Sequence, residues 1–303
     1  MSREAVADPR PVPKTGEAAH AATRRRSVAA IVAFARAQPT GAVCLVLILL
    51  FVLAAIAAPL AAPYDPLQQH RADLLASPGA RYPLGTDALG RDVLSRILYG
   101  ARTSLLIGVA TILLSVVIGT FFGILSGLLG RGVDIVVQRV MDAVHAIPPI
   151  VLLLFISATL GPSLPNVIIA LVVVITPGFN RLARGETLRI REETYVEAAR
   201  ATGAGLLRIM GRHVLPNLLA SMFTLATVSF AGVIIAESAL SFLGLGAPPP
   251  TPSWGGMLSD GLQYVTEAPW LVLVPAIVLS LAVFAFNLVG DALRDHLDPR
   301  MKR

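Results

Sequence analysis

Lysine and cysteine are almost absent from this chain of 303 residues. Its two lysines, Lys14 and Lys302, follow Pro13 and Met301, whereas a phosphate-binding P-loop needs a lysine between glycine and serine or threonine. The sequence therefore excludes an ATPase site of that type in this chain. The single cysteine, Cys44, excludes an intramolecular disulfide and a cysteine-based metal cluster.

Histidine is scarce too, and its spacing argues against a metal site. The histidines form no HExxH motif and no close cluster with acidic residues. They are His20, His70, His145, His213 and His296. No constellation of nucleophile, base and metal indicates a membrane-embedded enzyme. We therefore predict a non-catalytic chain that binds no metal and no cofactor of its own.

Charged residues are few, and apolar residues take their place. Only 15% of the residues are charged, 55% are hydrophobic, and the mean hydropathy is +0.71, which lies outside the usual range of soluble proteins. The net charge of +6 could suggest a nucleic-acid partner. The basic residues, however, flank apolar runs instead of forming one patch with interleaved aromatic side chains. We expect a protein of the lipid bilayer that binds no nucleic acid.

The apolar residues gather into runs that are long enough to cross a membrane, which takes roughly 17 to 25 mainly apolar residues. Pro177 and Gly178 interrupt the fourth run, so we expect a kink there and a helix that continues beyond it. The sequence predicts an all-α membrane protein with about six transmembrane helices. They are expected at residues 41–62, 104–129, 143–161, 166–182, 218–243 and 269–290.

The distribution of basic residues predicts the orientation of these helices. With the N-terminus inside, 20 of the 25 basic residues fall in cytoplasmic segments, as the positive-inside rule requires. The other five fall in the first outer loop, residues 63–103. Both termini are then cytoplasmic, with a tail over residues 1–40 that is predicted to be disordered and a tail over residues 291–303. The alternative, a cleaved signal peptide, would need a shorter apolar run after Pro39.

The outer loop contains a segment with helical spacing. From Thr86 to Arg102, apolar residues recur on one helical face. Asp87 and Arg91 are spaced for an i,i+4 ion pair. Asp92 and Arg96 share that spacing. We expect an interfacial helix that lies along the outer membrane surface, with an irregular polar loop as the alternative.

Glycines in the second apolar run predict close packing of helices. Gly119, Gly123 and Gly127 recur every fourth residue, so their bare backbones share one face that another helix can approach closely. This spacing indicates a tightly packed bundle and carries no information about a substrate.

A polar insert, residues 183–217, separates the fourth and fifth apolar runs. Its glycine at position 203 suits the left-handed conformation that ends a helix. Two adjacent alanines leave room for a partner surface to come close, and the glutamate before them offers a charge to orient it. An ordinary charged connector is the alternative on composition alone. The residues that we expect to contact a partner are Glu197, Ala198, Ala199, Gly203, Leu215 and Pro216.

The order of these residues resembles the EAA loop of permease subunits in bacterial ABC importers. The resemblance implies the type I permease fold of these importers, with a permease core over residues 104–290. It also implies that the insert forms a coupling helix that fits a groove on an ATPase subunit. His213 stands where the pattern usually has isoleucine, so that position is not carried over.

Three further stretches resemble the dipeptide and oligopeptide permease family, specifically the second of its two paired permeases. They are residues 83–105, 236–258 and 291–300. The resemblance implies a subunit of the bacterial inner membrane that forms a path for di- or oligopeptides. The implied partners are a second related permease, an external substrate-binding protein, and two ATPase subunits or one two-domain ATPase that bind ATP and Mg. Nickel importers share this architecture, so nickel is the alternative cargo.

Few ionisable side chains fall within the apolar runs. A charge near the bilayer centre costs about 2.5 to 3.5 kcal/mol on insertion scales, so it must face protein, water or an interface. With Ser238 and Ser241 beside it, Glu237 could line the translocation path or its gate, or it could anchor two helices through hydrogen bonds. Asp142 and Asp291 lie near the inner interface and are expected to be structural. An ion-coupled carrier, the alternative class of transporter, would show more intramembrane acids and broken helices.

Overall fold

The computed structural model describes residues 38–297, and the regular elements over this range are all helices. The predicted N-terminal tail lies almost entirely outside the described residues, and the predicted C-terminal tail lies partly outside them. In chain order the elements are α2 (Pro39–Ala61), α3 (Val93–Leu129), α4 (Arg131–His145), α5 (Pro149–Leu160), α6 (Leu164–Ile190), α7 (Thr194–Ala201), α8 (Leu206–Arg208), the π-helix η1 (Ile209–Val214), α9 (Leu215–Phe242), α10 (Trp254–Leu262) and α11 (Trp270–Leu297).

Five helical runs of the described chain are long and apolar enough to cross a membrane. They are α2, α3, α6, the continuous run from α8 to α9, and α11. The pair of α4 and α5 makes a sixth span if the two helices, which are bent by 90° relative to each other, are taken together. The prediction of an all-α membrane protein with about six spans is confirmed.

The structure corrects the third predicted span, residues 143–161. α5 has 12 residues, which is about 18 Å of helix, whereas the hydrocarbon core is about 30 Å thick. Pro148 and Pro149 separate α4 from α5, because a proline lacks the backbone N–H and disfavours a helical conformation in the residue before it. The span is therefore broken into a short apolar helix and an amphipathic one.

The structure also corrects the interfacial helix that was predicted over residues 86–102. Residues 86–92 form a tight turn, with an isolated β-bridge between Thr86 and Asp92. Residues 93–102 are the first turns of α3. The apolar periodicity from residue 93 onward therefore belongs to the first turns of this long helix.

Competition for Asp92 explains why one of the two predicted ion pairs does not form. The Asp92 carboxylate caps α3 by accepting hydrogen bonds from the Ser95 N–H at 2.7 Å and the Ser95 hydroxyl at 2.6 Å. Arg96 pairs elsewhere as a result. The other predicted pair, Asp87 with Arg91, forms at 2.6 Å, although within the turn instead of along a helix.

α6 is longer than the fourth apolar run. It continues through Pro177 to Ile190, so the predicted insert, residues 183–217, begins within α6, and α7 follows from Thr194. The turn between them is tied to α3, because the Arg191 guanidinium donates to the Gly127 carbonyl at 3.0 Å. This contact fixes where the insert leaves the bundle.

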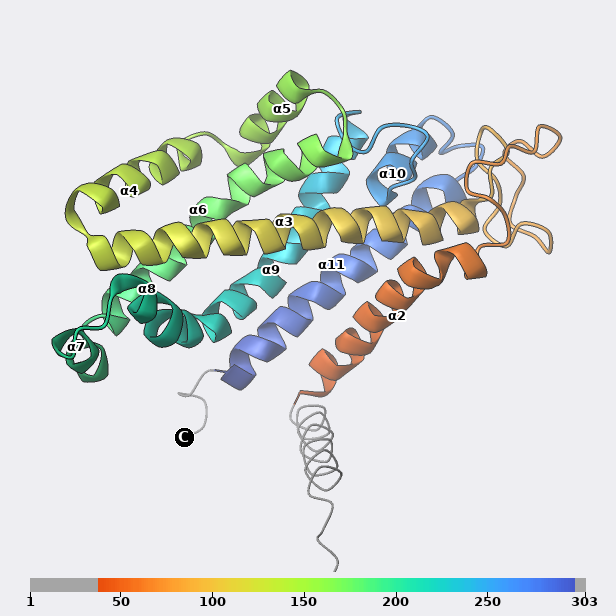
Figure 1. Cartoon of the computed structure of the whole chain (residues 1–303). Helices are drawn as coiled ribbons and strands as arrows, with labels where there is room; N and C mark the ends of the chain where they lie inside the picture. The colour runs from red at the N-terminus through yellow and green to blue at the C-terminus, as the bar shows by residue number, and fades with distance from the viewer. Residues whose placement is uncertain (1–37, 298–303) are drawn as a thin grey trace, which may run out of the picture.

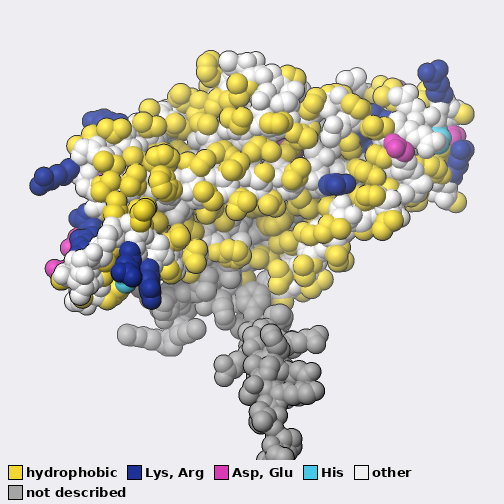
Figure 2. All heavy atoms as spheres, in the orientation of Figure 1, with side chains coloured by type: hydrophobic (Ala, Val, Ile, Leu, Met, Phe, Trp, Pro, Cys, Tyr) yellow, Lys and Arg dark blue, Asp and Glu magenta, His cyan; other side chains and the backbone are white. Residues whose placement is uncertain are grey.

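The long helices run between two ends of different character (Figure 1). The insert end carries α7 and α8, and the cap end carries α10 together with the loop of residues 62–92, which we call the cap loop. Apolar side chains cover the surface between the ends, and Arg side chains gather toward the ends (Figure 2). An apolar band between two charged ends is the surface that a bilayer-spanning bundle needs.

The contact between α3 and α6 is the most extensive one between two helices of the bundle. The glycine stripe of α3 lies in this contact, where added side chains would overlap α6. A Cβ atom would lie 2.6 Å from the Cβ of Phe179 at Gly119, 2.6 Å from the Cβ of Ala183 at Gly123, and 2.8 Å from the Cβ of Thr187 at Gly127. The glycines therefore set how closely the two helices approach.

Candidate functional site

α7 presents the Glu-Ala-Ala sequence on the surface of the insert end. Val196 is fully buried and holds α7 against the bundle. Glu197 and Ala198 are exposed, and Ala199 is half-buried. Because one apolar residue fastens the helix, the small and charged residues beside it remain free for contact with another molecule.

The turn after α7 requires glycine for its backbone conformation. Gly203 has φ +83°, in the left-handed region that other residues enter at a cost. The Ala204 N–H donates to the Ala199 carbonyl and the Gly203 N–H to the Arg200 carbonyl, both at 2.9 Å, which is the Schellman arrangement. A Cβ atom at Gly203 would meet nothing within 4 Å, so space imposes no constraint.

A small polar contact joins α7 to the start of α9. The Asn217 side-chain amide donates to the Tyr195 hydroxyl at 3.3 Å and to the His213 carbonyl at 2.6 Å. The rings of Tyr195 and His213 lie 6.0 Å apart. Leu215 and Pro216 are exposed in the same first turn of α9. The structure thus brings the two halves of the insert motif to one end of the molecule.

The insert end exposes apolar side chains outside the apolar band. Leu207 is 81% exposed, and Leu206 and Tyr195 are 37% and 43% exposed. The exposed arginines near them are Arg200, Arg208 and Arg212. Single exposed apolar residues are common on protein surfaces, so these side chains matter only together with the Glu-Ala-Ala sequence beside them.

The polar face with which α4 meets α6 was not predicted from the sequence. The Arg184 guanidinium donates to both carboxylate oxygens of Asp134, at 2.6 Å and 2.7 Å. A more exposed pair joins Arg181 to Asp142 at 3.0 Å. The spacing of the two aspartates and that of the two arginines each place both members on one helical face. That signal was present, but it does not reveal which helix faces which.

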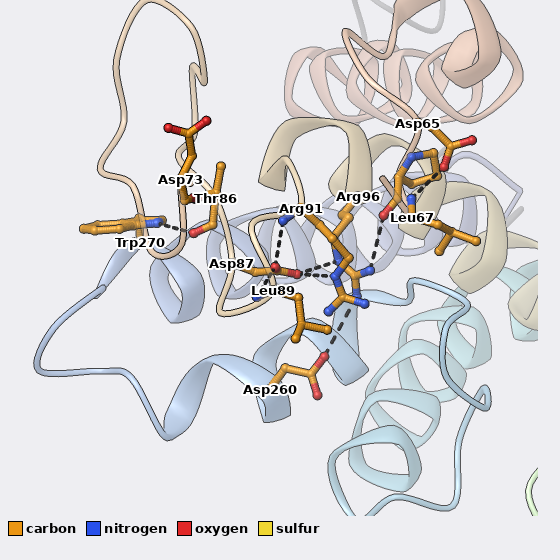
Figure 3. Close-up of polar contacts among 11 residues, drawn as sticks. Asp65, Leu67, Asp73, Thr86, Asp87, Leu89, Arg91, Arg96, Asp260 and Trp270 are labelled. Atoms are coloured by element: carbon orange, nitrogen blue, oxygen red, sulfur yellow. Dashed lines mark hydrogen bonds and ion pairs between the residues drawn. The ribbon is translucent and has the colours of Figure 1, made fainter. Parts of the chain in front are cut away.

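At the cap end, the buried Arg96 side chain joins three segments of the chain (Figure 3). The Arg96 side chain is 5% exposed and lies 3.5 Å from Asp87 and 3.9 Å from Asp260. It also donates to the Pro66 carbonyl at 3.5 Å. Arg96 on α3 is therefore a common partner of the cap loop and of α10.

The cap loop is closely packed around two of its residues, Thr86 and Gly90. The buried Thr86 hydroxyl donates to the Asp73 carbonyl at 2.5 Å and accepts from the Ala76 N–H at 2.8 Å. The Trp270 indole donates to the Thr86 carbonyl at 3.4 Å (Figure 3). A Cβ atom at Gly90, which has φ +73°, would collide with the backbone carbonyl of His70.

Glu237 is fully buried near the cap end of α9. One carboxylate oxygen accepts from the Ser241 hydroxyl at 2.8 Å, and the other accepts from the Ser104 hydroxyl on α3 at 3.3 Å. The Ser238 hydroxyl is buried without a hydrogen-bond partner among the described residues. Sequence analysis could place the two neighbouring serines beside Glu237. It could not find Ser104, which is 133 positions away.

A cavity of about 420 Å³ opens at the cap end, between the cap loop, α10 and the loop that precedes α10. Its walls include Arg96, Asp260, Ser241 and Ser253. Ser241 also binds Glu237, so the hydrogen-bond network of that carboxylate reaches the cavity wall.

The sequence matches a known family of transport proteins. Residues 119–303, more than half of the chain, match the family described as binding-protein-dependent transport system inner membrane component. This chain belongs to that family of permeases. Residues 35–78 of the permease also match the N-terminal transmembrane domain of oligopeptide transport permease C. The permease is accordingly a multi-pass protein of the inner membrane.

The permease resembles several characterised relatives over most of its length. It is 44% identical to the di/tripeptide transport system permease protein DppC of Pseudomonas aeruginosa, with 85% of this chain and 87% of the relative covered. It is 44% identical to the dipeptide transport system permease protein DppC of Alkalihalophilus pseudofirmus, with 85% of each covered. Identity to the glutathione transport system permease protein GsiD of Pectobacterium atrosepticum is 40%, with 84% and 85% covered.

A solved structure supports the fold. The permease matches a chain of the inward-facing MetNI methionine ABC transporter with a TM-score of 0.53, at 21% identity, and the match covers 66% of this chain and 95% of the other. At this identity the likeness concerns the fold alone. The predicted fold of an ABC importer permease is confirmed.

Proposed function

We propose that this permease is the second permease subunit of an ATP-driven importer and that it forms, with a related permease, a path for di- and oligopeptides. The observation that carries the proposal is the 44% identity, over 85% of this chain, to relatives named for dipeptide and tripeptide transport. The glutathione permease is a third relative whose named cargo is a short peptide. The alternatives are a nickel-importing permease and an ion-coupled carrier.

In this proposal the insert end lies in the cytoplasm, with both termini, and the cap end lies outside. The positive-inside rule supports this orientation. The arginines that belong to α4, to the inner part of α6 and to the insert are Arg131, Arg139, Arg181, Arg184, Arg189, Arg191, Arg200, Arg208 and Arg212.

The insert is the proposed docking site of an ATPase subunit. Its exposed Glu197 and Ala198, with the highly exposed Leu207, offer a charge, a flat surface and an apolar anchor. ATP and Mg belong to two such ATPase subunits, or to one two-domain ATPase, and this chain binds no cofactor and performs no catalysis. A second permease and an extracytoplasmic binding protein complete the importer.

The contacts of the insert suggest how ATPase closure reaches the helices. A displacement of α7 acts on α9 through the contact of Tyr195 with Asn217, and the adjoining turn acts on α3 through the hydrogen bond from Arg191 to Gly127. We expect α3 and α6 to move together, because they are in close contact along the glycine-lined face. The helices then alternate between an outward-open and an inward-open cavity, and ATP hydrolysis resets the cycle.

Uptake measurements in cells that lack only this chain, and in cells that have it restored, test the proposal. The labelled cargoes are a dipeptide, a tripeptide, a pentapeptide, glutathione and nickel. We expect peptide uptake to vanish and return with the chain, and the longest cargo taken up bounds the peptide length. Loss of nickel uptake alone would overturn the peptide cargo and keep the importer. Uptake of every cargo that is independent of this chain would overturn the proposed function.

A further inference from the structure

Two hydrogen-bond relays lead from the first turn of α10 to Glu237. In the shorter relay, the Trp254 N–H donates to the Ser104 hydroxyl oxygen at 3.4 Å, and the Ser104 hydroxyl donates to Oε2 of Glu237 at 3.3 Å. A residue of α3 therefore stands between the backbone of α10 and a carboxylate of α9.

The longer relay reaches the other carboxylate oxygen. The Gly256 N–H donates to the Ser253 oxygen at 3.1 Å, and the Ser253 hydroxyl donates to the Ser241 oxygen at 3.3 Å. The Ser241 hydroxyl then donates to Oε1 of Glu237 at 2.8 Å. Both relays end on the same buried side chain.

The direction of each relay follows from its ends. A backbone N–H can only donate, and a serine hydroxyl that accepts one hydrogen bond has a single proton to pass on. Two of the N–H groups that the first turn of a helix leaves without helical partners are thus satisfied through serines. A carboxylate accepts at both oxygens and is favoured at the N-terminal end of a helix, which makes it suited to the place where two such relays meet.

The packing around α10 leaves little freedom. A Cβ atom at Gly255 would overlap the backbone of Ser238, and one at Gly100 on α3 would lie 3.1 Å from the Trp254 ring. The Trp254 side chain is fully buried, and its indole N–H donates to the Ile97 carbonyl at 3.2 Å. The backbone of α10 at Gly255 therefore lies directly on that of α9 at Ser238, and the Trp254 ring lies against α3 at Gly100.

We infer that Glu237 is a positioning residue, which seats the N-terminus of α10 between α3 and α9 and thereby fixes one wall of the cavity at the cap end. Glu237 has no exposed surface, and among residues 38–297 its hydrogen-bond partners are the two serines. A role in binding a charged group of the cargo would need an exposed carboxylate. The consequence for transport rests on the proposed function, whereas the seating of α10 does not.

Cysteine accessibility in the purified complex tests the seating directly. Replacing the single cysteine (Cys44→Ala) and introducing Ser238→Cys places a reporter where α10 covers α9. With Glu237 intact, we expect this thiol to react slowly with a membrane-impermeant maleimide. Glu237→Leu removes both acceptors, and we expect labelling to become at least roughly tenfold faster, because a lost hydrogen bond to a charged group changes an equilibrium by that order. Glu267→Leu, which removes an exposed carboxylate of the same end, is the matched control.

Measurements of peptide uptake distinguish a positioning role of Glu237 from a requirement for its charge. Glu237→Gln keeps one acceptor oxygen, so we expect uptake between that of the original chain and that of Glu237→Leu. The double variant Ser104→Ala with Ser253→Ala breaks both relays without touching Glu237, and we expect it to reduce uptake and expose the reporter as well. This double variant also tests the inference if Glu237→Leu fails to fold.

Two results would overturn the inference. One is a reporter that stays protected in Glu237→Leu and in the double serine variant. The other is a complete loss of uptake in Glu237→Gln, equal to that in Glu237→Leu, while the double serine variant transports normally. That result would assign the carboxylate a direct role in charge recognition. If the original chain restores no peptide uptake, the proposed function fails, and the labelling experiment still decides the role of Glu237.

Discussion

The cap end and the insert end each depend on a glycine with a left-handed backbone, and the two glycines stand in opposite surroundings. Gly90 in the cap loop has φ +73° and no room for a Cβ atom beside the His70 carbonyl. Gly203 after α7 has φ +83° and nothing within 4 Å of a Cβ position. The cap loop is therefore closely packed around Gly90, whereas the surface around Gly203 stays open to another molecule.

Substitution of the cap glycine should have the largest effect on stability. Gly90→Ala combines left-handed strain of roughly 1–2 kcal/mol with a forced backbone displacement of about 1–3 kcal/mol. We expect a clearly lower thermal unfolding temperature for the purified complex. Gly79→Ala in the same loop is the control, because its Cβ atom would make only an ordinary contact of 3.9 Å with the Ser77 carbonyl. Equal unfolding temperatures for the two variants would remove the distinction between the ends.

Substitution of the insert glycine should have a smaller and more local effect. Gly203→Ala meets only the left-handed strain of roughly 1–2 kcal/mol, since no neighbour has to move. We expect faster amide hydrogen exchange over residues 194–204 and an unchanged exchange rate in the cap loop. Gly205→Ala, at φ −69° in open space, should leave both rates unchanged. Faster exchange at the cap would contradict the separation of the two ends.

A charge reversal on α7 should leave stability almost unchanged while it abolishes transport. Glu197 is exposed, so Glu197→Arg is expected to alter the free energy of unfolding by no more than about 0.5 kcal/mol. Co-purification of the ATPase subunits and peptide uptake should both be lost. The same reversal at the other end, Glu267→Arg, should retain the ATPase. Retention of the ATPase by Glu197→Arg would place the docking surface elsewhere.

The features predictable from sequence are those that a continuous stretch of residues carries. Burial in a bilayer marks whole runs of residues, so α2, α3, α6, α9 and α11 could be placed from composition. The spacing of Gly119, Gly123 and Gly127 predicts a closely packed face, but it does not name α6 as the helix on the other side. The insert could be located because polar residues interrupt two apolar runs.

The features that sequence analysis missed depend on contacts between distant segments. Asp92 could serve an ion pair or a helix cap, and the capping geometry at Ser95 decided between them. α4 is amphipathic, and its place in the broken span depends on where Arg184 offers a partner to Asp134. The serine relays of Glu237 join residues from three helices, so no local pattern could reveal them.

The π-helix η1 gives the insert a mechanical connection to the cap end. From Leu206 to Phe242 the chain is one helical run of 37 residues, which corresponds to roughly 55 Å at 1.5 Å per residue. Leu207 lies near the beginning of this helical run, and Glu237 lies near its end. A π-turn holds more residues than an α-turn, so the helix is wider at residues 209–214. A displacement of the insert can therefore reach the other end of the bundle along one continuous helical run, in which the wider turn of η1 lies next to the insert.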